Sequence, residues 1–258
     1  MSRSISNLAG LLLDLDGVLY VGEQPIKGAV ETVRYLKNKN IPIRFTTNTT
    51  VRSVASLHDK MQRLGLPVER DEIFSAVRAT AQYLHNVGKP SCFFLLTDDP
   101  MMDFAEFPVS DTQPDYIVIG DVGKYWDYEL MNRVFHMVMN GAEMIALHKG
   151  KYWETENGLQ VDMGAFIAGL EYVTGKEAMV IGKPEPSFFK LALDDLGAAA
   201  ETVAMVGDDI DVDIGGAQAV GMTGILVKTG KYRDEVTRKS LIKPDLIIDS
   251  VMSLRDIL

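Results

Sequence analysis

The sequence predicts an α/β fold with a parallel-sheet core and a second, smaller α/β domain inserted into it. Short apolar runs alternate with amphipathic helical segments along the whole chain, which is the pattern of strand–helix–strand units. Several of the apolar runs end in acidic or other polar residues. The length of 258 residues suits one large domain or two smaller ones.

The two outer parts of the chain carry the strands expected in the core sheet. Residues 11–13, LLL, suit a strand buried on both faces, as in a parallel sheet. Further strands are expected at 41–47, 178–183, 202–209, 221–230 and 243–250. Apolar residues at helical spacing predict helices at 28–40, 51–66, 75–88, 187–197 and 214–221.

The middle part repeats this rhythm with strands and helices of its own. Strands are expected at 91–98, 114–121 and 143–150, helices at 126–141 and 164–175, and a hairpin around the Asn157-Gly158 turn. We therefore expect residues 1–78 and 179–258 to form a single core domain and residues 79–178 to form an inserted domain.

The composition of the chain argues against several classes of binding partner and cellular location. The net charge of −10 argues against a nucleic-acid-binding surface, which usually needs a basic face. No apolar stretch approaches the roughly 20 residues of a membrane-spanning helix, and the N-terminus lacks the apolar core of a signal peptide. The single cysteine, Cys92, cannot form an internal disulfide. We expect no membrane contact and a cytoplasmic location.

Polar residues end the apolar runs of the expected core sheet. Asp14 and Asp16 end the first run, Thr47 and Asn48 the second, Lys183 the third, and Asp208 and Asp209 the fourth. Ligands of open α/β sheets bind at the carboxyl ends of the strands. We therefore expect these side chains to meet at the carboxyl edge of the sheet. The combination of two acids, a hydroxyl, an amine and a further acid indicates a site for phosphoryl transfer.

The residue types explain the chemistry expected there. Asp14, Asp16 and Asp208 offer oxygen ligands to a hard divalent cation such as Mg²⁺, which would offset the repulsion between the first two carboxylates. The same cation would neutralise phosphate charge and align the phosphorus with a nucleophile. Asp14 is suited to be that nucleophile through an aspartyl-phosphate, while Lys183 and Thr47 would hold the phosphoryl oxygens.

Two further aspartates have supporting roles in this interpretation. Asp16, two residues past the nucleophile, is placed to protonate the leaving oxygen and then to deprotonate the attacking water. Asp213, in the run GDDIDVD, is placed to orient Lys183 or a metal-bound water.

Four segments, DLDGVLY, FTTNTT, IGKPEP and VGDDIDVD, resemble the four signature motifs of the haloacid dehalogenase superfamily of phosphohydrolases. The resemblance implies a Rossmann-like core in which Asp14 is the nucleophile, Asp16 the acid/base and main-chain metal ligand, and Asp208 the metal-ligating carboxylate. It implies that Thr47 and Lys183 bind the phosphoryl group. Asn48 and Thr49, in the same motif as Thr47, join the phosphate-binding candidates.

The resemblance also discriminates within the superfamily. Dehalogenases lack an aspartate at the Asp16 position and ion-pumping ATPases have threonine there, so Asp16 implies a phosphatase or a phosphomutase. The insertion between FTTNTT and IGKPEP is similar to that of the subfamily with an α/β cap. The segments at 146–166 and 224–233 most resemble the phospholysine phosphohistidine inorganic pyrophosphate phosphatases and related hydrolase-domain proteins. Asp209 departs from several relatives, which have Arg or Asn, and adds negative charge beside the expected metal.

The expected function is Mg²⁺-dependent hydrolysis of a small phosphorylated metabolite, either a phosphomonoester, a pyrophosphate or a phosphoramidate. A phosphomutase is the alternative within enzymes, and a non-catalytic phosphate-sensing or partner-binding module is the alternative outside them. The family resemblance further implies a homodimer formed through the cap.

Overall fold

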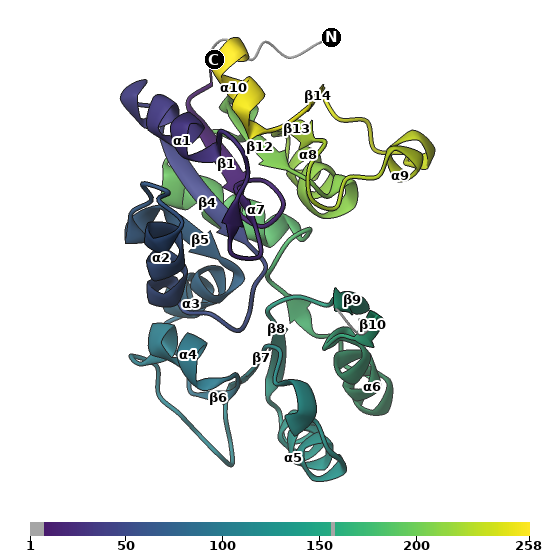
Figure 1. Ribbon diagram of the computed structural model, residues 1–258. Helices are drawn as coiled ribbons and strands as arrows, with labels where there is room; N and C mark the ends of the chain where they lie inside the picture. Colours follow the sequence, from purple (N-terminus) through teal and green to yellow (C-terminus); the bar gives the residue numbers. More distant parts are fainter. Residues whose placement is uncertain (1–7, 156–157) are drawn as a thin grey trace. The chain divides into compact units, whose positions relative to one another are not determined.

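The computed structural model describes residues 8–155 and 158–258, and their contacts divide the chain into two compact units (Figure 1). The first unit comprises Met1–Thr47, Ala55–Ser75 and Lys183–Leu258. The second comprises Asn48–Val54 and Ala76–Gly182. Each unit has its own parallel sheet.

The first unit is built on six parallel strands in the order β14-β13-β12-β1-β4-β5. Their bounds are β1 Gly10–Asp14, β4 Ile43–Thr47, β5 Ile73–Ser75, β12 Val203–Gly207, β13 Thr223–Val227 and β14 Leu246–Ile248. Every residue of β1, β12 and β13 is buried, as expected for central strands covered on both faces. The predicted α/β class with a Rossmann-like core is confirmed.

The helices of this unit lie between its strands in the sequence or follow the last strand. They are α1 Ala29–Asn38, α2 Val54–Arg63, α7 Pro186–Leu196, α8 Gly216–Ala219, α9 Asp234–Lys239 and α10 Leu254–Ile257. Short 3₁₀ turns lie at Arg70–Glu72, Ala200–Thr202 and Val251–Ser253, and a π-helical turn, η6, spans Ile210–Gly215. A small hairpin, β2 Tyr20–Val21 with β3 Gln24–Pro25, follows β1.

The register of the central strands places three chain segments at one edge of the sheet. Asp14 is paired with Thr46 on β4, and Leu13 with Val206 on β12. Because these strands are parallel, the residues that follow Asp14, Thr47 and Val206 all leave the sheet at its carboxyl edge. This edge is where the acidic residues were expected.

The second unit has a four-stranded parallel sheet in the order β11-β8-β7-β6 and a two-stranded antiparallel ribbon. Its strands are β6 Cys92–Leu95, β7 Tyr116–Ile119, β8 Glu143–Ala146, β9 Tyr152–Thr155, β10 Gly158–Val161 and β11 Met179–Val180. Its helices are α3 Ala76–Asn86, α4 Asp98–Met101, α5 Tyr128–Met139 and α6 Gly164–Thr174, with 3₁₀ turns at Met102–Phe104 and Gly123–Tyr125. The predicted hairpin is formed by β9 and β10; Asn157 of its turn lies outside the described residues.

One predicted strand belongs to the other sheet. The run 178–183 was expected to end a core strand in Lys183, but β11 pairs in parallel with β8 of the second unit. A short apolar run cannot specify which of two sheets it joins, because both offer a parallel edge. Lys183 instead begins the last segment of the first unit, three residues before α7.

Candidate active site

Three buried aspartates converge at the carboxyl edge of the first unit's sheet. Asp14 ends β1, Asp208 follows β12 directly, and Asp213 lies within η6. Each offers a carboxylate oxygen, and these oxygens lie within 4.8 Å of one another. The side chains are almost fully buried, with 8%, 3% and 2% of the residue surface exposed in that order. Such a concentration of negative charge needs a compensating cation.

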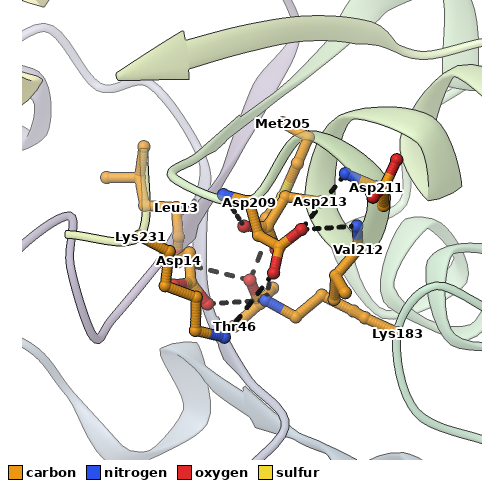
Figure 2. Close-up of polar contacts among 10 residues, drawn as sticks. All are labelled: Leu13, Asp14, Thr46, Lys183, Met205, Asp209, Asp211, Val212, Asp213 and Lys231. Atoms are coloured by element: carbon orange, nitrogen blue, oxygen red, sulfur yellow. Dashed lines mark hydrogen bonds and ion pairs between the residues drawn. The ribbon is translucent and has the colours of Figure 1, made fainter. Parts of the chain in front are cut away.

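The ammonium of Lys183 supplies part of that compensation (Figure 2). Its Nζ donates to Oδ1 of Asp14 at 2.5 Å and to Oδ1 of Asp213 at 2.7 Å. Lys183 itself is 4% exposed, so the three charges form a network screened from water. The sequence placed Lys183 beside the acids, and the structure brings it into direct contact with two of them.

The buried surroundings shift the pKa values of Asp14, Lys183 and Asp208. Burial is the largest influence on Asp14 and raises the pKa of its carboxyl; the Lys183 ammonium opposes this, and Asp213 adds to it. Burial disfavours the charged form of Lys183, but Asp14 and Asp213 outweigh it and raise the pKa of the ammonium. Burial also raises the pKa of Asp208 to about 6, against the lowering effect of a hydrogen bond from the backbone of Lys231.

A loop that follows β13 closes over Asp208. The backbone N–H of Lys231 donates to Oδ2 of Asp208 at 2.7 Å, and the hydroxyl of Thr229 donates to the carbonyl of Gly17 at 2.5 Å. Gly17 and Gly230 both have positive φ, and a Cβ on either would lie about 2 Å from Asp208 Oδ2. Only glycine fits at these two positions.

This loop was not among the predicted site residues. The run KTGKYR contributed to the family resemblance, but its contact with Asp208 depends on how two distant turns meet. The glycine at 230 between polar residues is the signal in the sequence, because isolated glycines at turns often mark a close approach of the backbone.

Asp209 has a structural partner of its own. Its Oδ1 accepts hydrogen bonds from the backbone N–H groups of Asp211 and Val212, both at 3.1 Å, so it caps the start of η6. Its Oδ2 lies 3.6 Å from Nζ of Lys231. Its own N–H donates to Oδ2 of Asp213 at 3.2 Å (Figure 2). Asp209 thus shapes the turn that presents Asp213, and its charge is partly offset by Lys231.

The remaining predicted residues lie outside the carboxylate cluster. Asp16 is exposed, forms an isolated bridge with Tyr20, and is absent from the carboxylate cluster found among the described residues. Thr47 is the buried last residue of β4. Asn48 and Thr49 continue the chain from Thr47 and are counted with the second unit by their contacts.

The chain is similar in sequence and in fold to known hydrolases. Residues 11–107 match the family model of haloacid dehalogenase-like hydrolases, and residues 180–254 match a second, HAD-hydrolase-like model. The human haloacid dehalogenase-like hydrolase domain-containing protein 2 is 38% identical over 244 residues, which cover 94% of this chain and 93% of that protein. The chain belongs to the haloacid dehalogenase-like hydrolase family.

Two further comparisons place the chain within this family. Human phospholysine phosphohistidine inorganic pyrophosphate phosphatase is 36% identical over 263 residues, covering 99% of this chain and 96% of that protein. A solved structure, the p-nitrophenyl phosphatase from Archaeoglobus fulgidus, superposes with a TM-score of 0.92 at 30% identity and covers 98% of this chain and 100% of its own. The resemblance predicted from the four motifs is confirmed.

No helix among the described residues is long and apolar enough to cross a membrane. This agrees with the absence of any extended apolar segment in the sequence.

Proposed function

We propose that this haloacid dehalogenase-like hydrolase is a Mg²⁺-dependent phosphatase that acts on a small phosphorylated metabolite through an aspartyl-phosphate. The observation that carries this proposal is the buried contact between Asp14 and Lys183, with Asp208 and Asp213 beside it. A buried carboxylate held against an ammonium at the carboxyl edge of a parallel sheet is suited to attack phosphorus while the ammonium neutralises charge. The relatives named as phosphatases support the same reaction.

The proposed reaction has two steps at Asp14. In the first, a carboxylate oxygen of Asp14 forms a bond to phosphorus while the bond from phosphorus to the leaving oxygen breaks. Asp16 gives a proton to that oxygen. In the second, Asp16 takes a proton from a water molecule, whose oxygen attacks phosphorus and releases Asp14 and inorganic phosphate. Lys183 and Thr47 would hold the phosphoryl oxygens in both steps, with Asn48 and Thr49 assisting from the same motif.

The acidic cluster fits a hard divalent cation. Asp14, Asp208 and Asp213 supply only oxygen donors, the ligand type that Mg²⁺ prefers, and their closest oxygens lie within 4.8 Å of one another. Asp14 and Asp208 would bind the ion through their carboxylates and Asp16 through its backbone carbonyl, with Asp213 supporting from beside Lys183. When bound, Mg²⁺ would neutralise part of the phosphate charge.

We propose that the second unit is the cap that selects the substrate. The relative named above acts, by its name, on phospholysine, phosphohistidine and inorganic pyrophosphate, and the structural neighbour on p-nitrophenyl phosphate. These names support testing this chain for hydrolysis of both phosphoramidates and phosphoesters.

A homodimer through the second unit is part of the same proposal. Helices α5 and α6 border an apolar groove of about 420 Å³, which includes the stacked rings of Trp126 and Phe166. Tyr128 and Val173 on its rim are exposed. Apolar side chains gathered in this way on a surface often mark a protein interface. Light scattering of the purified protein checks the stoichiometry.

Turnover of p-nitrophenyl phosphate with and without Mg²⁺ tests the proposed function. Asp14→Asn removes the nucleophile, and we expect its turnover to fall to background. Asp211→Asn is the matched control, because Asp211 is an exposed aspartate on the same turn as the cluster. We expect this control to keep the wild-type rate within about twofold.

The outcomes separate the alternatives. A phosphomutase would pass the phosphoryl group to a second hydroxyl of a sugar phosphate instead of releasing inorganic phosphate. A folded wild-type protein without turnover on phosphoesters, phosphoramidates or pyrophosphate would contradict the proposal and favour a non-catalytic module.

A further inference from the structure

Helix α2 buries a lysine in its apolar stripe. Leu57, Lys60 and Met61 follow the spacing of a core-facing helix side, and all three are buried. The side chain of Lys60 is only 9% exposed. A buried ammonium is unfavourable unless something nearby compensates its charge, so its presence at a core position needs an explanation.

The compensation comes from the hairpin that follows β1. Nζ of Lys60 lies 4.0 Å from the centroid of the Tyr20 ring, within the range of a cation–π contact. It also lies 3.6 Å from Oε1 of Glu23, whose side chain is 65% exposed. Tyr20 is itself 4% exposed, so the contact between ammonium and ring is shielded from water and correspondingly strong.

Tyr20 closes the turn that carries Asp16. Its carbonyl accepts a hydrogen bond from Gly17 N–H at 2.7 Å, and its own N–H donates to the carbonyl of Leu15 at 3.3 Å. Asp16 and Tyr20 form an isolated bridge. Tyr20 is therefore hydrogen-bonded to the backbone on both sides of Asp16.

We propose that Lys60 is a positioning residue for Asp16. Its ammonium holds the Tyr20 ring, Tyr20 holds the turn, and the turn fixes where Asp16 meets the leaving oxygen. The inference rests on the proposed function, in which Asp16 is the acid of the first step. A neutral apolar residue would pack equally well at this core position but would leave the turn less firmly held.

The leaving group distinguishes positioning from simple packing. p-Nitrophenolate leaves as a stable anion and gains little from a proton, whereas phenolate, with a conjugate-acid pKa of about 10, depends on one. The aspartyl-phosphate is the same for both substrates, so kcat/KM, which reports formation of this intermediate, is the constant to compare. A variant that misplaces Asp16 loses kcat/KM for phenyl phosphate selectively. A variant that only weakens the fold loses both activities together.

The first test compares the two substrates in Lys60→Met and Lys60→Arg. We expect Lys60→Met to lower kcat/KM for phenyl phosphate about tenfold and kcat/KM for p-nitrophenyl phosphate less than about twofold. Lys60→Arg keeps a cation over the ring and should restore the ratio. Lys39→Met is the matched control, because Lys39 is exposed and lies 5.4 Å from the Tyr35 ring on α1, away from this turn. Equal losses on both substrates in Lys60→Met would overturn the inference.

The second test needs no turnover. Hydrogen exchange of the Gly17 amide, which donates to Tyr20, should accelerate at least about tenfold in folded Lys60→Met and remain at the wild-type rate in Lys60→Arg and Lys39→Met. An unchanged exchange rate of the Gly17 amide in Lys60→Met would overturn the proposed positioning role of Lys60, even if the protein proves not to be a phosphatase. Wild-type turnover of p-nitrophenyl phosphate decides the proposed function separately.

Discussion

The ammonium of Lys183 donates to a carboxylate oxygen of Asp14 at 2.5 Å, although the two residues lie 169 positions apart in the chain. Asp14 ends a central strand, and Lys183 begins the segment that returns to the first unit. The contact therefore depends on correct folding of both outer parts of the chain. The same ammonium also donates a hydrogen bond to Asp213, so one positive charge offsets two buried carboxylates.

Replacement of Lys183 by methionine should destabilise the protein strongly. The change leaves Asp14 and Asp213 buried without their ammonium, and removing one partner of a buried pair typically costs about 3–5 kcal/mol. Chemical denaturation in the presence of a chelator measures this loss. Lys190→Met, an exposed lysine on α7, is the control and should change stability by less than about 0.5 kcal/mol. Equal stabilities for the two variants would contradict a stabilising role for the contacts of Lys183 with Asp14 and Asp213.

Alanine at position 17 should damage the site more than alanine at position 22. Both glycines have positive φ, but a Cβ on residue 17 would lie 1.9 Å from Asp208 Oδ2, whereas one on residue 22 meets no atom within 4 Å. Gly22→Ala thus bears only the backbone strain, of about 1–2 kcal/mol. We expect Gly17→Ala to weaken Mg²⁺ affinity, measured by calorimetry, while Gly22→Ala binds as the wild type does. Similar affinities would show that Asp208 takes no part in binding the ion.

The stabilisation that Mg²⁺ gives should increase with pH. Because burial raises the pKa of Asp208 to about 6 from an ordinary value of 3.8, the folded protein holds this proton more tightly than the unfolded chain. The associated stability is present at low pH and is lost as the pH rises through about 6. A cation competes with the same proton, so the Mg²⁺-induced rise in Tm should be larger at about pH 7.5 than at about pH 5. An equal rise at both pH values would contradict the assignment of Asp208 as a ligand.

Asp209 should tolerate asparagine better than alanine. Its Oδ1 accepts two backbone N–H groups at the start of η6, and an asparagine oxygen can accept the same bonds. Asp209→Ala should lose about 1 kcal/mol of stability in urea denaturation, and Asp209→Asn considerably less. If Asp209→Asn loses as much stability as Asp209→Ala, the ion pair with Lys231 contributes more than the two hydrogen bonds at the start of η6.

The sequence allowed the central strands to be predicted because their apolar runs end in polar residues. β1, β4 and β12 form adjacent strands, and their carboxyl ends place Asp14 and Asp208 together, as the pattern indicated. Strand β11 was misplaced because a run of few apolar residues fits either sheet. The Gly230 loop could not be predicted, because its contact with Asp208 is set by tertiary packing.

Lys60 shows a further limit of pattern reading. The residues around it predict a core-facing helix side, and a lysine there is usually expected to reach solvent with its ammonium. Its burial under Tyr20 arises from a hairpin forty residues earlier in the chain, whose position the local sequence of α2 does not encode.

In the proposed reaction, Asp14 carries the phosphoryl group during turnover. Wild-type protein should be quenched in acid during steady hydrolysis of p-nitrophenyl phosphate with Mg²⁺, then digested and mapped by mass spectrometry. We predict a phosphoryl group on the peptide that contains Asp14 and none in Asp14→Asn. Sustained wild-type turnover with the phosphoryl group on another residue, or on none when single-turnover sampling spans the whole reaction, would contradict the account.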